Sequence, residues 1–360
     1  MLAPECYNDL AKNVKSPMIF LEKQPGNDCF SQEDHWNATE RGYPMVNFTL
    51  RKLLGMIPML LIITFLIYAG IEMMPGDVID FLIPMDQLAE MTEEEIAAFR
   101  AAKGLDGPMI IRYFNWLLGV CKGDLGYSLQ NNVPVAQLMM QKMPATVELS
   151  LAALIISSVL GIVLGMISAL QKGKIADNVL TVAGMVGLAI PQFLFGVFCI
   201  ILFCLNLNWF PVGQRGDGGL ISELHHLFLP AFVLGISQTA GVMRYSRSAM
   251  LDSMNCDYVK TARAKGLPEW KVNLFHGFRV ACTPVMVLIG FRLPTLISGS
   301  IVIENIFQWP GVGVWFTDAI KTQNTPIIMS VGLFMVLMVL LSSLLVDILT
   351  AVLDPRVKLS

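Results

Sequence analysis

Charged side chains are scarce in this chain. Asp, Glu, Lys and Arg make up only 15% of its 360 residues, whereas hydrophobic residues make up 54%, and the mean hydropathy is +0.60. An ordinary soluble domain carries roughly 25% charged residues. The composition therefore indicates a membrane protein, and a net charge of −3 gives no sign of a nucleic-acid partner.

Motifs that would supply chemistry are also missing. The chain has no G-x-x-x-x-G-K-[ST] phosphate-binding loop, so it is not expected to bind ATP through that motif. No nucleophile–base pair stands out, which argues against an enzyme. The 7 cysteines show no C-x-x-C spacing and no zinc-like spacing to a histidine. His225 and His226 are a weak nickel-ligand pair, because adjacent helical residues face apart. We predict no metal site.

Long apolar runs are abundant, and a membrane-spanning helix needs about 20 such residues. We expect six spans and an all-α polytopic fold. They are Leu53–Met74, Val147–Leu170, a span within Val179–Leu207, Leu227–Met243, about Thr283–Ile303 and about Ile327–Leu353. Pro191 predicts a kink in the third.

Basic residues set the expected orientation, because cytoplasmic loops carry an excess of Lys and Arg. They precede the first span, separate the second from the third and follow the last: Arg51, Lys52, Lys172, Lys174 and Arg356. Both termini are then cytoplasmic, and residues 75–145 form an outer helical region. Within it, Thr92 and Glu95 form a capping box, so the run of glutamates is interpreted as a solvated helix start rather than a ligand site.

Further signals for helix ends and starts occur in this predicted outer region. Lys103-Gly104 predicts the end of the capped helix, and Pro108 the start of the next. Residues 1–47 are polar and irregular, without the basic region and apolar core of a secretory signal. We treat them as an N-terminal extension of a membrane domain at 48–358.

One polar, basic segment, Tyr258–Pro284, interrupts the apolar runs and overlaps most of a predicted cytoplasmic loop at 248–282. Gly266 favours a left-handed helix stop, and Pro268 can open a second short helix. Tyr258 and Ala262 are expected to present the face that packs on a partner. The basic residues of this region are Arg244, Arg247, Lys260, Arg263, Lys265, Lys271 and Arg279.

The sequence YVKTARAKGL at 258–267 resembles the cytoplasmic loop of ABC-importer permease subunits. The resemblance is strongest to the peptide and nickel branch of these importers. That loop is the branch's version of the EAA loop, which sits in a groove of the ATPase subunit. Further resemblances are PGD at 75–77, GDLGYS at 123–128, MPATVEL at 143–149, WPG at 309–311 and DPR at 354–356. Glu304 and the WPG turn are expected outside the spans. The resemblance implies a type I importer fold and an ATPase-coupling role for Tyr258, Thr261, Ala262, Arg263, Lys265 and Gly266.

Polar residues within the spans indicate a translocation pathway. Gln238 and Thr239 are too polar for a lipid-facing helix. Arg292 lies well inside the fifth span, where a lone cation costs at least about 2.5 kcal/mol. It either braces the kink next to Pro294 or contacts substrate carboxylates along the pathway, and the sequence leaves both interpretations open.

The resemblance also implies partners: a second, related permease, two ABC ATPase subunits carrying ATP and Mg²⁺, and an extracytoplasmic substrate-binding protein. It implies no cofactor in this subunit and a location in a bacterial inner membrane. Import of di- or oligopeptides is the expected function. Import of nickel or a nickel chelate is the first alternative. A channel or membrane enzyme without ATPase partners is the second.

Overall fold

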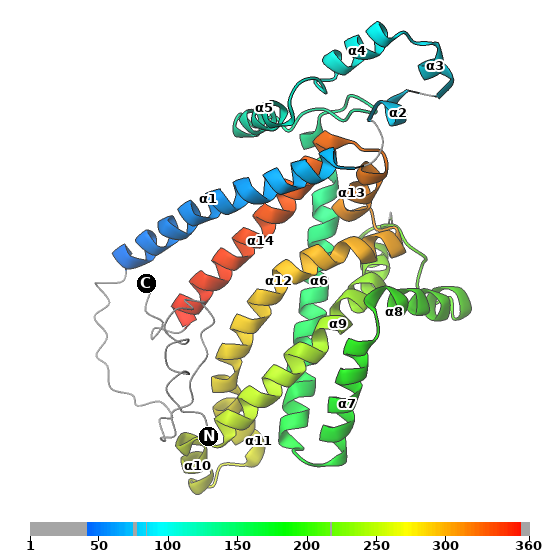
Figure 1. Cartoon of the computed structure of the whole chain (residues 1–360). Coiled ribbons are helices and arrows are strands. Elements are labelled where there is room, and N and C mark those ends of the chain that lie inside the picture. The colour runs from blue at the N-terminus through cyan, green and yellow to red at the C-terminus, as the bar shows by residue number, and fades with distance from the viewer. Residues whose placement is uncertain (1–41, 75–77, 84, 217, 354–360) are drawn as a thin grey trace, which may run out of the picture. The chain divides into compact units, whose positions relative to one another are not determined.

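A computed structural model describes residues 42–74, 78–83, 85–216 and 218–353. These ranges are mainly helical (Figure 1), and their one isolated β-bridge joins Tyr127 to Pro134. The N-terminal extension up to residue 41 and the PGD and DPR sequences lie outside the described residues.

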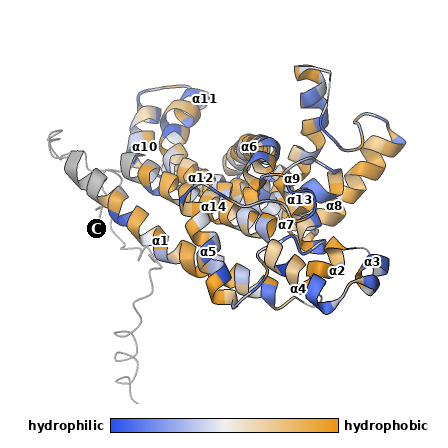
Figure 2. Cartoon of the chain, turned by 90° about the horizontal axis from the view of Figure 1, so that it is seen from above, coloured by the Kyte–Doolittle hydropathy of each residue, from blue (hydrophilic) through white to orange (hydrophobic). Residues whose placement is uncertain are grey.

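The membrane-spanning expectation is confirmed. Five described helices are long and apolar enough to cross a membrane, or six if one bent pair counts as a single span. Figure 2 shows the hydrophobic residues along these helices. The long helices are α1 (Gly42–Glu72), α6 (Val135–Leu170), α9 (Leu220–Met254), α12 (Arg279–Phe307) and α14 (Thr325–Leu353).

The bent pair departs from the prediction. Instead of one kinked helix, α7 (Ile175–Ala189) and α8 (Gln192–Cys199) with its continuation η3 (Ile200–Asn206) meet at 100°. Pro191 disfavours the helical conformation of the residue before it, and Ile190 is accordingly extended, with φ −81° and ψ 123°. The proline therefore breaks the run rather than bending it.

Two helices begin before the spans that were predicted from the apolar runs. The helix that carries the second span begins at Val135, where Pro134 caps it, and it continues through Pro144 into the apolar run. The helix of the fourth span begins at Leu220, ahead of the predicted span start at Leu227, and it therefore includes His225. In both cases the helix extends beyond the apolar run on which the prediction rested.

The core of the molecule is the pairing of α6 with α9, which α12 joins. Glycines let the helices approach closely, as small residues do in membrane helix packing. A Cβ added at Gly161 would lie 2.5 Å from Val242 Cβ, and one added at Gly165 would lie 2.6 Å from the Met243 carbonyl oxygen. The helix α14 packs on α12 and α1.

Short helices form most of the predicted outer region at 75–145: α2 (Val78–Leu82), α3 (Met85–Glu90), α4 (Glu93–Ala102) and α5 (Met109–Cys121). The capping box between Thr92 and Glu95 is present, and Lys103 caps the other end of α4. Pro108 caps α5, as predicted. In Figure 1 these helices and the segment around α10 and α11 lie at opposite ends of the long helices.

Candidate functional site

The basic segment folds as helix, glycine break, helix. The first helix, α10 (Asp257–Ala264), ends at Lys265, and Gly266 follows with φ +75°. Pro268 then caps α11 (Glu269–Lys271). The second helix does not stop there: it continues through η4 (Val272–Phe278) into α12, and residues 269–307 form one 39-residue helix. This helix therefore begins well before the span predicted at about Thr283–Ile303, and the segment continues directly into that span.

The inner face of this segment differs from the prediction. Ala262 is 4% exposed and packs with Val259 and Val272 inside the chain. The Tyr258 hydroxyl lies 2.6 Å from the Ser253 hydroxyl oxygen. Ala262 and Tyr258 thus attach the segment to α9 and η4, and Ala262 offers no surface to a partner.

The outer face of the segment combines polar and apolar side chains. Thr261, Arg263, Lys265 and Gly266 are exposed, and Arg263 Nε donates to Glu269 Oε1 at 3.0 Å. Large apolar side chains beside them are also exposed, namely Leu267, Trp270, Leu274 and Phe275. Such a patch marks a binding surface for a protein or a membrane.

Some of the basic residues are neutralised within the chain. Arg247 lies on α9, where its Nε and Nη2 bond the two carboxylate oxygens of Asp177 at 2.8 and 2.7 Å. Asp177 also accepts bonds from the Ser168 hydroxyl and the Gly173 N–H. This pair attaches the start of α7 to α9. Sequence reasoning missed Asp177, although an acid in the first turn of a helix is a recognisable signal.

In the middle of the spans, the structure brings two of the three predicted pathway residues together. Arg292 Nη1 on α12 donates to Gln238 Oε1 on α9 at 2.9 Å. Thr239 is buried and its hydroxyl donates to the Gly235 carbonyl of its own helix at 3.1 Å. The polar pair therefore connects α9 with α12, and Thr239 is not part of it.

Near the C-terminal end of α12, Glu304 forms a connection that sequence reasoning missed. It was expected outside the spans, yet its exposed fraction is 0%. Its carboxylate accepts hydrogen bonds from the Thr146 hydroxyl at 2.8 Å, the Ser300 hydroxyl at 3.0 Å and the Gly313 N–H at 2.6 Å. No local sequence pattern indicated that Glu304 would be buried, because its partner Thr146 lies 158 residues away along the chain.

The WPG turn takes part in the same cluster. Trp309 is fully buried and its indole N–H donates to the Ala145 carbonyl at 2.8 Å. The Val312 N–H, at the start of α13 (Val312–Lys321), donates to the Thr146 hydroxyl at 2.8 Å. The MPATVEL and WPG sequences, far apart along the chain, thus form one buried polar cluster.

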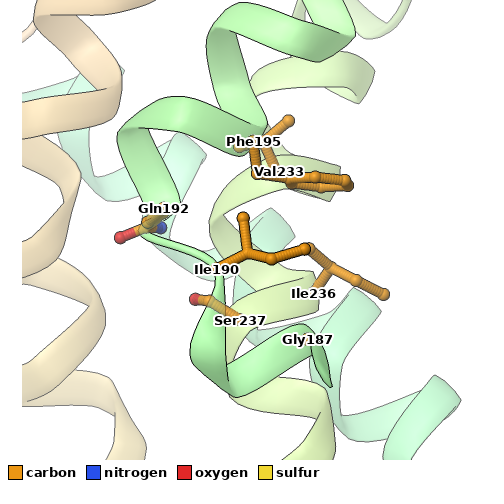
Figure 3. Close-up of a pocket in the computed structure, with 7 residues that line it drawn as sticks. All are labelled: Gly187, Ile190, Gln192, Phe195, Val233, Ile236 and Ser237. Carbon is orange, nitrogen blue, oxygen red and sulfur yellow. The ribbon is translucent and has the colours of Figure 1, made fainter. Parts of the chain in front are cut away.

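A cavity of about 70 Å³ lies where α7 and α8 meet beside α9. Figure 3 shows its lining: Gly187, Ile190, Gln192, Phe195, Val233, Ile236 and Ser237. Ligand pockets usually measure roughly 300–1,000 Å³, so this space is too small to hold a peptide.

The two adjacent histidines do not converge on a common point. His225 Nε2 lies 2.8 Å from the Trp209 carbonyl oxygen, and His226 Nδ1 lies 2.8 Å from the Ser222 carbonyl oxygen. Their ring centroids are 6.4 Å apart. In the part of the chain that the structure describes, no group of three or more metal-binding side chains occurs.

Two family models match the chain. "Binding-protein-dependent transport system inner membrane component" matches residues 161–359, and the model of the N-terminal part of such membrane components matches residues 45–150. Both matches leave the first 44 residues outside.

Curated relatives match over most of the chain. The oligopeptide transport system permease protein AppB of Bacillus subtilis is 37% identical, over 87% of this chain and 100% of its own. The dipeptide permease DppB of Escherichia coli is 34% identical, over 87% and 99%. The glutathione permease GsiC of Salmonella choleraesuis is 32% identical, over 87% and 99%.

Among solved structures, an amino acid ABC transporter crystallised with histidines is 13% identical, covering 60% of this chain and 94% of that one, with a TM-score of 0.46. The family matches and the curated relatives carry the assignment: the chain belongs to the family of binding-protein-dependent transport system inner membrane components.

Proposed function

We propose that this chain is a pathway-forming permease subunit of an ATP-driven importer of di- or oligopeptides. It would act with a second permease, two ATPase subunits that bind ATP and Mg²⁺, and an extracytoplasmic binding protein. Both termini would be cytoplasmic, with residues 75–145 outside. One observation carries the proposal: after the break at Gly266, the exposed basic and apolar segment continues from Glu269 as one helix into an apolar run long enough to cross a membrane.

That continuity supplies a coupling mechanism. The helix at 269–307 is 39 residues long, which corresponds to about 58 Å at 1.5 Å per residue. A displacement of α10 and α11 by a closing ATPase pair would tilt α12 as a lever. Because Arg292 lies on α12, the tilt would also move the polar pair in the middle of the spans. Thr261, Arg263, Lys265 and Gly266 would lie at the ATPase contact, with Tyr258 and Ala262 holding the segment in shape.

The choice of peptide over nickel rests on the relatives, whose names refer to oligopeptides, dipeptides and glutathione. Nickel or a nickel chelate is the alternative substrate. A channel or membrane enzyme without ATPase partners is disfavoured, because the matched family is that of binding-protein-dependent transport components.

The test is transport by the reconstituted complex. The chain would be co-expressed with its genomically adjacent permease and ATPases, placed in proteoliposomes and supplied with the binding protein. We expect ATP-dependent uptake of tripeptides and none of radioactive nickel. Gly266→Val should reduce uptake at least about tenfold, because a β-branched residue opposes the left-handed turn. Uptake of nickel in place of peptide, or uptake without ATP, would contradict the proposal.

A further inference from the structure

We propose that Arg292 binds the C-terminal carboxylate of the peptide as it passes along α12. This inference rests on the proposed function and specifies the chemistry recognised in the middle of the pathway. The bound group would be a carboxylate, held through two parallel hydrogen bonds from the guanidinium group.

The first support is the depth of Arg292. It lies between Arg279, where α12 begins, and the buried Glu304 at the outer end of the same helix. At 1.5 Å per residue, each is about 18–20 Å away along the axis. Gln238 lies similarly near the middle of α9. A cation at this depth is costly unless it faces a partner or a wet pathway, and such residues are functional by default.

The second support is the lack of a balancing charge. The hydrogen-bond partner that the structure gives Arg292 is the neutral Gln238 amide. Across the described ranges, no carboxylate forms an ion pair with Arg292, whereas Arg247 pairs with Asp177, and Arg215 pairs with both Glu148 and Glu223. A guanidinium has five N–H donors, so Gln238 can orient the group and leave donors for an anion.

The third support is an exposed strip on α12 that includes hydroxyl side chains. Phe291, Thr295, Ser298 and Val302 recur every three or four residues and are exposed, so they share one face of the helix. Thr295 and Ser298 interrupt the apolar character of this face. Arg292 is partly exposed at the edge of this strip, next to the two hydroxyl side chains.

A matching strip runs along α9, with Gln238, Gly241, Tyr245 and Ser248 at the same kind of spacing. Gly241 makes room for the guanidinium, because a Cβ added there would lie 2.5 Å from Arg292 Nη2. Arg292 therefore lies where the two strips meet, flat against a helix that presents small and polar side chains. An anion moving along these strips would pass its remaining donors.

The competing explanation is that Arg292 only fastens α12 to α9 through Gln238. The two explanations differ in one observable. A fastening residue affects all substrates alike, whereas an anion site distinguishes a peptide with a free carboxylate from the same peptide with a C-terminal amide.

The experiment measures ATP-dependent uptake by the reconstituted complex with saturating binding protein. The probes are a mixture of tripeptides with neutral side chains and the corresponding C-terminal amides, each quantified by mass spectrometry. Affinities of the binding protein for both forms, measured separately, correct the ratio. We expect the parent to favour the carboxylate form, and Arg292→Gln to reduce that preference at least about fivefold, with Arg292→Lys between them.

Gly241→Ala is the second variant, because it displaces the guanidinium without removing its charge and should also lower the preference. It keeps the test valid if Arg292→Gln does not assemble. An unchanged carboxylate-to-amide ratio in both variants, or an equal loss of uptake for both forms, would overturn the inference while leaving the proposed function intact. A parent complex that transports no tripeptide would instead overturn the proposed function.

Discussion

At the scale of single residues, Glu304 shows how a buried carboxylate can hold three segments together. It accepts hydrogen bonds from α6 through Thr146, from its own helix through Ser300, and from the start of α13 through the Gly313 N–H. The fit is tight, since a Cβ added at Gly311 would lie 2.4 Å from Glu304 Oε2. The cluster thus fixes the outer ends of α6 and α12 relative to each other.

We therefore predict that Glu304→Ala destabilises the protein. Each buried donor left without an acceptor costs roughly 1–3 kcal/mol, and the substitution orphans the Thr146 hydroxyl and the Gly313 N–H. Thermal unfolding of the complex in lipid nanodiscs should occur several degrees lower. Glu94→Ala, at an exposed position outside the capping contacts, is the control and should leave the unfolding temperature unchanged. An unaltered unfolding temperature for Glu304→Ala would contradict the role given to the cluster.

At the scale of helices, Asp177 and Arg247 connect the start of α7 to α9. The Asp177 side chain is 5% exposed and that of Arg247 is 30% exposed. Removing one partner of a buried pair costs about 3–5 kcal/mol, whereas removing both can cost little. The partial exposure of Arg247 lowers the expected figure to about 1–3 kcal/mol.

A double-mutant cycle tests this connection. Arg247→Met alone should destabilise the protein more than Asp177→Asn together with Arg247→Met, because the single change leaves a buried carboxylate uncompensated. The readout is the same thermal unfolding in nanodiscs. Additive losses in the double variant would show that the two side chains do not interact.

The capping box of α4 predicts a pH effect in the outer region. Hydrogen bonds from the backbone N–H and the hydroxyl of Thr92 lower the pKa of the Glu95 carboxyl. A group whose pKa is lower in the folded state stabilises that state above its unfolded pKa. The stabilisation is lost as the pH falls through the folded pKa.

Amide hydrogen exchange in α4, corrected for its intrinsic pH dependence, should therefore be slow at neutral pH and faster in acid. Glu95→Gln is the matched control, since glutamine can cap without titrating and should remove the pH dependence. Equal acid sensitivity in the parent and the variant would assign the effect to another group.

Features that depend on neighbouring residues were predicted correctly from the sequence, whereas contacts between distant segments were not. Thr92, Gly266 and Pro268 act within a few residues, and each was placed correctly. The polar connections made by Glu304 and Asp177 depend on helices that meet only after folding, so no local pattern revealed them. The burial of Ala262 was missed for the same reason, because its neighbour Val272 belongs to the next helix.

At the scale of the whole molecule, the parts form a connected path. The exposed segment at 257–271 leads into α12, α12 carries Arg292 beside α9, and its outer end is fixed to α6 by Glu304. Movement applied at one end would thus reach the middle of the spans, while the outer end stays braced. The central claim is that an ATPase subunit applies this movement through the outer face of α10 and α11.

Site-specific cross-linking tests that claim most directly. A photoreactive amino acid would replace Trp270, which is 60% exposed on this face. A matched control would replace Trp209, which is also 60% exposed but lies in the predicted outer loop. After illumination of the assembled complex, we expect Trp270 variants to form a covalent product with an ATPase subunit, increased by ATP, and Trp209 variants to form none. A Trp270 variant in a complex active in transport that cross-links only to lipid, or a Trp209 variant that captures the ATPase, would contradict the account.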